Sequence, residues 1–330
     1  MKKLAFLLTV LFISQAATVS AQISNADTLT QEIRSYVARN FSKSRTFNLY
    51  WETGPSYDYK LKRNNGQELE NGKIKDIHTI KFSVNAPVLL LRNFSLYVNG
   101  RANFYKFEAT NDATGEVSPI FSKIDDAYCY YNGGLSASYR MKIAGKPLIL
   151  NANISGDGWE KDFEEIEGTF SAVMMLKNTP TTSFSVGLYG MTLYNQVPVV
   201  PIITYWHQFN PRLSVDVTLP SRAYLRYQFN DKHRFSLGAQ MESERFYMRP
   251  DMTDLPKTCL YNETTIKPEL VYEFIINKHF YLIARGGGSA IIQSGLYKTD
   301  RKGIDGDPLV EFDRSVQPFF NLGFSYNLFK

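Results

Sequence analysis

The chain has 330 residues, with 37 lysine and arginine residues against 32 aspartate and glutamate residues. Residues 1–21 read as an export signal with two lysines and no acid, which leaves 35 basic against 32 acidic residues in the mature chain. This small excess indicates no nucleic-acid partner. Two cysteines in a chain of this length exclude a disulfide framework, and no stretch after the signal approaches the roughly 18 consecutive apolar residues of a transmembrane helix.

Residues 1–21 have the parts of a cleaved secretory signal. Lys2 and Lys3 form the basic start, Leu4 to Ile13 form the apolar stretch, and Val19-Ser20-Ala21 is a small-residue cleavage site that predicts Gln22 as the first mature residue. An N-terminal membrane anchor is less favoured, because this apolar stretch is too short to cross about 30 Å of hydrocarbon. We expect an exported protein.

Residues 22–43 carry apolar side chains at helical spacing. Leu29, Ile33, Tyr36 and Val37, with Phe41 as a further candidate, follow helical spacing, and Asp27 or Thr28 could cap the start. The sequence predicts a short N-terminal helix. It leaves open whether this helix lies in the periplasm or enters the barrel as a plug.

Residues 44–330 alternate between apolar and polar side chains in segments long enough to cross a bilayer as tilted strands. Fourteen such segments are predicted, at 44–60, 75–87, 94–108, 124–142, 147–155, 164–177, 182–191, 198–208, 212–219, 223–229, 233–247, 262–276, 279–293 and 316–329. Short turns alternate with mostly longer polar connectors, as periplasmic turns alternate with extracellular loops. The fold class is therefore all-β, a closed antiparallel transmembrane β-barrel of about 14 strands, with twelve as the fallback because prolines interrupt residues 198–220.

The alternation also assigns a lipid face and a lumen face to each strand. In residues 94–105 the odd positions, among them Arg101, turn toward the lumen, while Phe94 and Leu96 turn toward outer-membrane lipid. Charged side chains on the lipid face would cost about 2–4 kcal/mol each near the bilayer midplane. The candidate lumen-lining residues are Arg101, Arg140, Asp216, Arg226, Glu242, Lys267, Glu269 and Arg285. Pairing Leu219 with Ala223 across the turn would set Asp216 directly opposite Arg226, a stabilising arrangement.

The last strand carries a recognisable pattern. Asn321, Gly323, Phe324, Tyr326 and Leu328 follow the polar–x–Gly–apolar–x–apolar–x–apolar order. This order resembles the C-terminal signal read by barrel-assembly machinery, which is thus an expected partner. Phe329 and Lys330 depart from the pattern, because many such proteins end on an aromatic residue.

A second resemblance runs from Pro198 to Met248. It comprises Pro198-Val-Val-Pro-Ile-Ile-Thr-Tyr, Asn210-Pro211, Leu213-Ser-Val-Asp-Val-Thr-Leu-Pro220, Ala223-Tyr-Leu-Arg-Tyr227 and Asp231-Lys232. This stretch resembles an uncharacterised family of bacterial outer-membrane barrel domains. The resemblance implies location in the outer membrane of a Gram-negative bacterium and a barrel architecture, and it implies no mechanism, because the family has no established activity.

The sequence gives no sign of catalysis. The four histidines are isolated, and the nucleophile-elbow, zinc-protease and phosphate-loop motifs are missing, so we predict no enzyme, cofactor or metal. Asp305-Gly306-Asp307 carries only half of a calcium-loop pattern and is better read as a solvated turn. The pairing of Cys129 with Cys259 stays open.

Three functions fit these observations. The leading hypothesis is a passive pore or small-solute channel, because a barrel this wide cannot be filled by wall side chains alone. The alternative is a structural or surface-binding barrel that uses its long loops. A fatty-acid-type transporter ranks lower, because the predicted lining is charged. The solute and the oligomeric state are not readable from the sequence.

Overall fold

The computed structural model describes residues 45–121, 127–192, 199–300 and 307–328. The predicted export signal (residues 1–21), the predicted helix (residues 22–43) and most of the Asp305-Gly306-Asp307 turn lie outside these described residues. Within the described residues, no helix is long and apolar enough to cross a membrane.

All strands belong to one antiparallel sheet. They are β1 (Phe47–Gly54), β2 (Tyr57–Arg63), β3 (Glu68–Leu90), β4 (Phe94–Asn111), β5 (Tyr128–Ile143), β6 (Lys146–Gly158), β7 (Phe163–Thr179), β8 (Thr182–Met191), β9 (Val199–Gln208), β10 (Leu213–Leu219), β11 (Arg222–Gln228), β12 (His233–Met248), β13 (Cys259–Ile275), β14 (Phe280–Lys298), β15 (Val310–Arg314) and β16 (Gln317–Tyr326).

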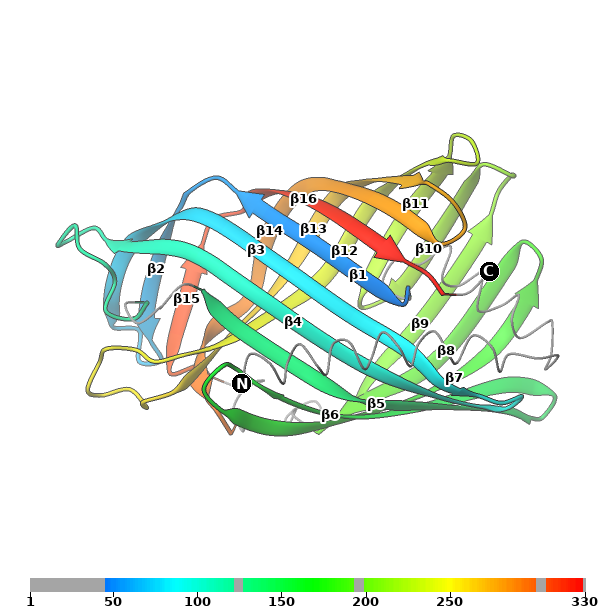
Figure 1. The fold of residues 1–330 in the computed structure, drawn as a ribbon, viewed down its shortest axis with the longest axis horizontal. Coiled ribbons are helices and arrows are strands. Elements are labelled where there is room, and N and C mark those ends of the chain that lie inside the picture. Colours follow the sequence, from blue (N-terminus) through cyan, green and yellow to red (C-terminus); the bar gives the residue numbers. More distant parts are fainter. Residues whose placement is uncertain (1–44, 122–126, 193–198, 301–306, 329–330) are drawn as a thin grey trace, which may run out of the picture.

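The sheet closes on itself into a barrel (Figure 1). β1 and β2 are two halves of one wall strand interrupted at Pro55-Ser56, and both pair with β3. β15 and β16 are likewise two halves, interrupted at Ser315-Val316, and both pair with β14. Closure is made by β1 on β16 and by β2 on β15. Counted this way the barrel has fourteen wall strands, which confirms the predicted number and removes the fallback of twelve.

Alternate side chains separate an apolar outer wall from a polar interior. On β12 the outward Leu237 is 63% exposed, whereas its inward neighbour Ser236 is 6% exposed. The same contrast separates Ile154 from Ser155 on β6, at 60% and 5%. Exposed leucine, isoleucine and phenylalanine over a closed barrel require hydrocarbon as the surrounding medium. The chain is therefore a transmembrane barrel of a Gram-negative outer membrane.

One end of the barrel is built from short turns, here named the turn end. Three of these turns use the same device, in which Asn210, Asn230 and Asn277 each accept two backbone N–H bonds with the side-chain oxygen, from the residues two and three positions later. This is the Asx geometry expected of asparagine in tight turns.

The opposite end, here named the loop end, differs from prediction. β3 begins at Glu68 rather than 75, and β13 begins at Cys259 rather than 262, so hairpins occupy much of what the sequence predicted as irregular loop. The added residues of β3 are mostly polar, whereas those of β13, Cys259 to Tyr261, are consecutive apolar residues that are all buried. The regular apolar–polar alternation used to delimit strands is therefore missing from both extensions. The extended wall encloses the region described next.

Candidate functional site: the barrel lumen

The loop end of the lumen is filled by a packed apolar core. Inward side chains of several strands contribute to it, and Phe246 stacks on both Tyr128 and Tyr261 with ring centroids 4.6 Å apart. The buried members are Tyr59, Leu61, Ile74, Tyr105, Ala109, Ile120, Phe121, Tyr128, Tyr130, Phe246, Tyr247, Met248, Cys259, Leu260, Tyr261, Leu296, Val310 and Phe312. This loop-end core fills part of the lumen on that side with apolar side chains.

The tip of the β12–β13 hairpin forms a large part of this closure. Three consecutive residues of β12, Phe246 to Met248, are buried, and so are Cys259 to Tyr261 on β13. A strand in a barrel wall buries at most one face in the lumen, so burial of successive residues shows that both faces of the tip are covered. β12 also approaches β5, which is not its neighbour in the sheet. The hairpin tip thus folds into the mouth of the barrel.

Neighbouring loop segments fold inward as well. Ile120 and Phe121, which follow β4, are buried in the loop-end core. The Asp251 N–H donates to the carbonyl oxygen of Pro119 at 2.8 Å, which ties this segment to the β12–β13 connection. The segment after β4 and the β12–β13 connection are therefore joined to each other at the loop end.

Two tyrosine hydroxyls inside the loop-end core share one carboxylate. Asp157 on β6 accepts hydrogen bonds from the Tyr130 hydroxyl on β5 at 2.6 Å and from the Tyr247 hydroxyl on β12 at 3.0 Å. The second bond crosses the lumen, because β12 and β6 are not adjacent. A buried hydroxyl group without a hydrogen-bond partner would lower the stability of the fold. Asp157 therefore stabilises the hairpin tip in its observed position.

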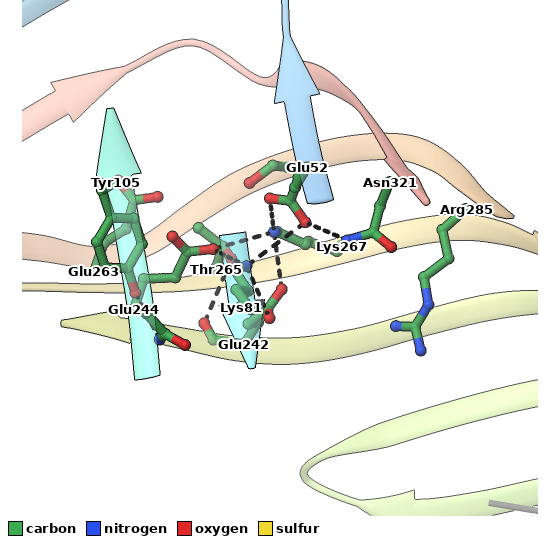
Figure 2. A network of polar contacts seen from close by, with 12 residues as sticks. Glu52, Lys81, Tyr105, Glu242, Glu244, Glu263, Thr265, Lys267, Arg285 and Asn321 are labelled. Atoms are coloured by element: carbon green, nitrogen blue, oxygen red, sulfur yellow. Dashed lines mark hydrogen bonds and ion pairs between the residues drawn. The ribbon is translucent and has the colours of Figure 1, made fainter. Parts of the chain in front are cut away.

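Below the loop-end core, two ammonium groups and three carboxylates meet in the lumen (Figure 2). Lys81 on β3 lies 2.5 Å from Glu244 and 3.1 Å from Glu242, both on β12. Lys267 on β13 lies 2.8 Å from both Glu52 on β1 and Glu242. Charges this far from water are tolerated because each is compensated at short range. We name these five residues the lumen network.

A second ion pair spans the lumen in another direction. Arg245 on β12 lies 3.3 Å from Glu167 on β7, and its Nε donates to Asn262 on β13 at 3.0 Å. β12 is thereby joined to β3 on one side and to β7 on the other, although neither is its neighbour. Side chains of β12 thus connect strands that are not hydrogen-bonded neighbours in the sheet.

Toward the turn end, the predicted Asp216–Arg226 contact forms, but not in the predicted register. Asp216 stands opposite Tyr224, and Arg226 stands opposite Ser214, because the β10–β11 turn contains only Pro220-Ser221. The predicted pairing of the two strands is therefore displaced by two residues, since the partner of Asp216 is Tyr224 and not Arg226. The side chains meet diagonally instead, with Arg226 Nη2 2.5 Å from Asp216 Oδ2. Long side chains reach such diagonal positions easily.

The other predicted lining residues fall on two different parts of the wall. Glu242 and Lys267 belong to the lumen network, and Arg285 on β14 lies 3.7 Å from Glu269 on β13, which also accepts a hydrogen bond from Tyr224. Arg101 shares the lumen-facing parity of the buried Asn103, and is itself exposed. Arg140 lines a cavity on the wall of β3 to β8.

The wall of β3 to β8 has a different chemistry from the charged wall of β12 to β14. Its lumen-facing side chains in the turn half border a cavity of ≈ 360 Å³ and are mostly amides and hydroxyls, with Arg140 as the charged residue among those that line it. Asn99 donates to Asn153 at 2.8 Å, and Asn151 donates to Ser171 at 3.0 Å. The β3 to β8 side of the turn half is therefore polar and hollowed, in contrast to the apolar loop end.

Comparison with protein families gives one match. Residues 131–327 match a family model described as "Domain of unknown function (DUF6268)". The chain belongs to this family. The matched part runs from β5 to the end of β16, and so contains the β12–β13 hairpin, Arg140 and Lys267, but neither Glu52 nor Lys81. Comparison with curated protein sequences found no match.

Three solved structures resemble this DUF6268 barrel. An outer membrane channel from Pseudomonas putida F1 has 10% identity, a TM-score of 0.43, and coverage of 86% of this chain and 94% of that chain. A Pseudomonas aeruginosa FadL homologue has 11% identity, a TM-score of 0.39, and coverage of 86% and 90%. The transport unit of the autotransporter AIDA-I from Escherichia coli has 10% identity, a TM-score of 0.36, and coverage of 91% and 97%. Similarity at this level assigns no substrate.

Residues of the predicted assembly signal make structural contacts in β16 and directly after it. The Asn321 side chain donates to Glu52 of the lumen network at 3.3 Å. Gly323 stands opposite Tyr50 on β1, and a Cβ atom at Gly323 would lie 2.3 Å from the tyrosine ring. Phe324 faces outward, and Tyr326 stacks with His279 at a centroid distance of 6.0 Å. Leu328 follows the strand, and its N–H donates to Thr46 at 3.0 Å. Recognition by the assembly machinery stays a prediction.

The loop-end core is the feature that sequence reasoning missed. Its signal was present, because Tyr128-Cys129-Tyr130 and Phe246-Tyr247-Met248 interrupt the alternation with consecutive apolar residues. Such runs indicate strands buried on both faces. Cys129 lies in the first of these runs, and Cys259 lies at the start of β13. Both are buried free thiols, so no disulfide joins them.

Proposed function

We propose that this chain is a gated outer-membrane channel for small polar solutes, closed at its loop end in the resting state. The observation that carries the proposal is the contrast along the lumen. A polar cavity occupies the turn half, while the β12–β13 tip, the loop-end core and the lumen network fill the rest.

The closure depends on side chains rather than on the wall. Lys81 with Glu244, Arg245 with Glu167, and Tyr247 with Asp157 all join strands that are not neighbours in the sheet. The tip is also held on one side by the β13–β14 ladder, in which Cys259 pairs with Lys298, so an opening movement would carry the ends of β12, β13 and β14 together and break these cross-lumen contacts. A fourteen-stranded barrel is wide enough to conduct once they are released.

The other hypotheses receive less support. A permanently open pore conflicts with the filled loop end. A surface-binding barrel needs projecting loops, whereas the segments before β5 and β13 pack into the mouth. A transporter of fatty-acid type needs an apolar cavity, whereas the cavity of β3 to β8 is bordered mainly by amides and hydroxyls. The proposal assigns no catalytic residue.

Planar-bilayer recordings of the purified protein test the proposal. We expect rare, brief openings for the wild type, and a clear increase in open time for Phe246→Ala and for the double variant Lys81→Met/Glu244→Gln. Leu237→Ala is the control, because this residue lies on the same strand but faces lipid. Permanent conduction by the wild type would refute the gate, and silence of both folded variants would refute the channel.

A further inference from the structure

The cavity on β3 to β8 has a lining suited to a particular class of solute. Three asparagines, four serine or threonine residues and two tyrosines contribute to it, together with one arginine, Arg140 on β5. Its volume of ≈ 360 Å³ falls in the range of small-molecule sites, which begins at about 300 Å³. No aspartate or glutamate is among the described residues that line it.

Arg140 differs from the other arginines that line the lumen in the turn half. Arg226 and Arg234 each lie within 2.6 Å of a carboxylate, on Asp216 and Glu273. None of the ion pairs formed within the described part of the chain includes Arg140, which is half-buried beside neutral side chains. A guanidinium group in such a position attracts a carboxylate or a phosphate, because its planar donors match both groups.

The neutral side chains are already held in place. Asn99 donates to Asn153 at 2.8 Å and to Ser136 at 3.3 Å, and Asn151 donates to Ser171 at 3.0 Å. Amides and hydroxyls so fixed still have hydrogen-bonding capacity, because each oxygen can accept more than one bond. They present both donors and acceptors, which is what a solute with several hydroxyl groups requires.

We propose that this cavity binds a small solute carrying one oxyanion group, either carboxylate or phosphate, and several hydroxyl groups. Arg140 holds the oxyanion, and the asparagine and serine side chains of β5, β6 and β7 receive the hydroxyls. The inference deepens the proposed channel function, on which it rests for its biological meaning, by naming the class of solute that enters the turn half.

Isothermal titration of the full-length protein in detergent tests the site directly. The probes are glucuronate, glucose 6-phosphate, glucose and acetate. We expect saturable binding of glucuronate, glucose 6-phosphate or both. Comparing these two probes shows whether the site prefers a carboxylate or a phosphate. Glucose lacks the charge and acetate lacks the hydroxyls, so both should bind at least tenfold more weakly. Equal binding of glucose, or no binding of either anionic sugar, would overturn the proposal.

Variants locate the binding. Arg140→Gln should weaken the anionic probe about tenfold or more, whereas Arg140→Lys, which keeps the charge but loses the planar fork, should weaken it less. Arg101→Gln is the matched control, since Arg101 is an exposed cation of the same wall that does not line the cavity. Equal losses of affinity from Arg101→Gln and Arg140→Gln would show that the probe responds only to the overall positive charge of the lumen, and would reject the site.

The two proposals fail separately. Binding in detergent with silent bilayers would reject the channel and keep the site. Conduction by the gating variants without any anion binding would keep the channel and reject the site.

Discussion

The ammonium of Lys81 lies 2.5 Å from the carboxylate of Glu244, and the two residues sit on β3 and β12, strands separated in the sheet by β13, β14, β16 and β1. The contact therefore crosses the lumen. Both partners are largely buried, so their mutual attraction is screened less than at a surface. Loss of Lys81 leaves one ammonium group with three carboxylates, whereas loss of Glu244 leaves two groups of each sign in the lumen network.

The first prediction concerns this imbalance. Lys81→Met leaves Lys267 alone with three carboxylates, and should lower the free energy of unfolding by about 3–5 kcal/mol. Lys81→Met/Glu244→Gln removes one charge of each sign and should recover part of that loss. Guanidinium unfolding of the protein in detergent measures both. A double variant less stable than the single variant would contradict this account of the network.

The fold was largely predictable because lipid imposes a strict rule. Each wall strand must turn apolar side chains outward at every second position, so the pattern in Phe94 to Tyr105 is readable without a structure. Strand number and turn positions follow from the same rule. The extensions beyond the membrane, such as the first residues of β3, were not predicted because no lipid contacts their outer face. Their buried face includes the polar Glu70 as well as Ile74, so the apolar–polar pattern is absent there.

The site was less predictable because ladder pairing constrains only adjacent strands. The sequence predicted that Asp216 and Arg226 would meet, since they lie on one hairpin, although the predicted strand pairing was displaced by two residues. No such rule brings Lys81 to Glu244, which lies 163 residues away. Their contact depends on the shape of the whole lumen, and on a hairpin tip that turns inward.

The second prediction concerns the close approach of Gly323 and Tyr50. A Cβ atom at position 323 would lie 2.3 Å from the Tyr50 ring, so Gly323→Ala must displace that ring. We expect a loss of about 1–3 kcal/mol in the free energy of unfolding, typical of overpacking. Gly286→Ala on β14 is the control, because its Cβ would meet nothing closer than 3.8 Å. A Tyr50→Ala background should remove most of the penalty, and an undiminished penalty there would show that the ring is not the cause.

The third prediction ranks the three residues that meet near the β10–β11 turn. Asp216 lies 2.5 Å from Arg226 and 3.3 Å from Arg222, so Asp216→Asn removes the carboxylate that compensates both cations. Arg222 is the more exposed of the two arginines and makes the longer contact. The loss of unfolding free energy should therefore fall in the order Asp216→Asn, Arg226→Gln, Arg222→Gln, with the last below about 1 kcal/mol. Equilibrium unfolding gives the order, and a reversed order for the arginines would contradict the diagonal contact.

The last prediction is a pH dependence outside the membrane. A hydrogen bond from Arg63 on β2 holds the pKa of Asp254, in the β12–β13 connection, below its ordinary value of 3.8. Because the pKa is lowered in the folded state, the Arg63–Asp254 contact contributes its full stabilisation at neutral pH. This stabilisation is lost as the pH falls through the lowered pKa. An NMR titration of the Asp254 carboxyl should give a pKa below 3.8, and Arg63→Gln should return it toward 3.8. Lys62→Gln, which alters the charge of the adjacent residue, should change it little, and an equal change would indicate general electrostatics instead of the Arg63 contact.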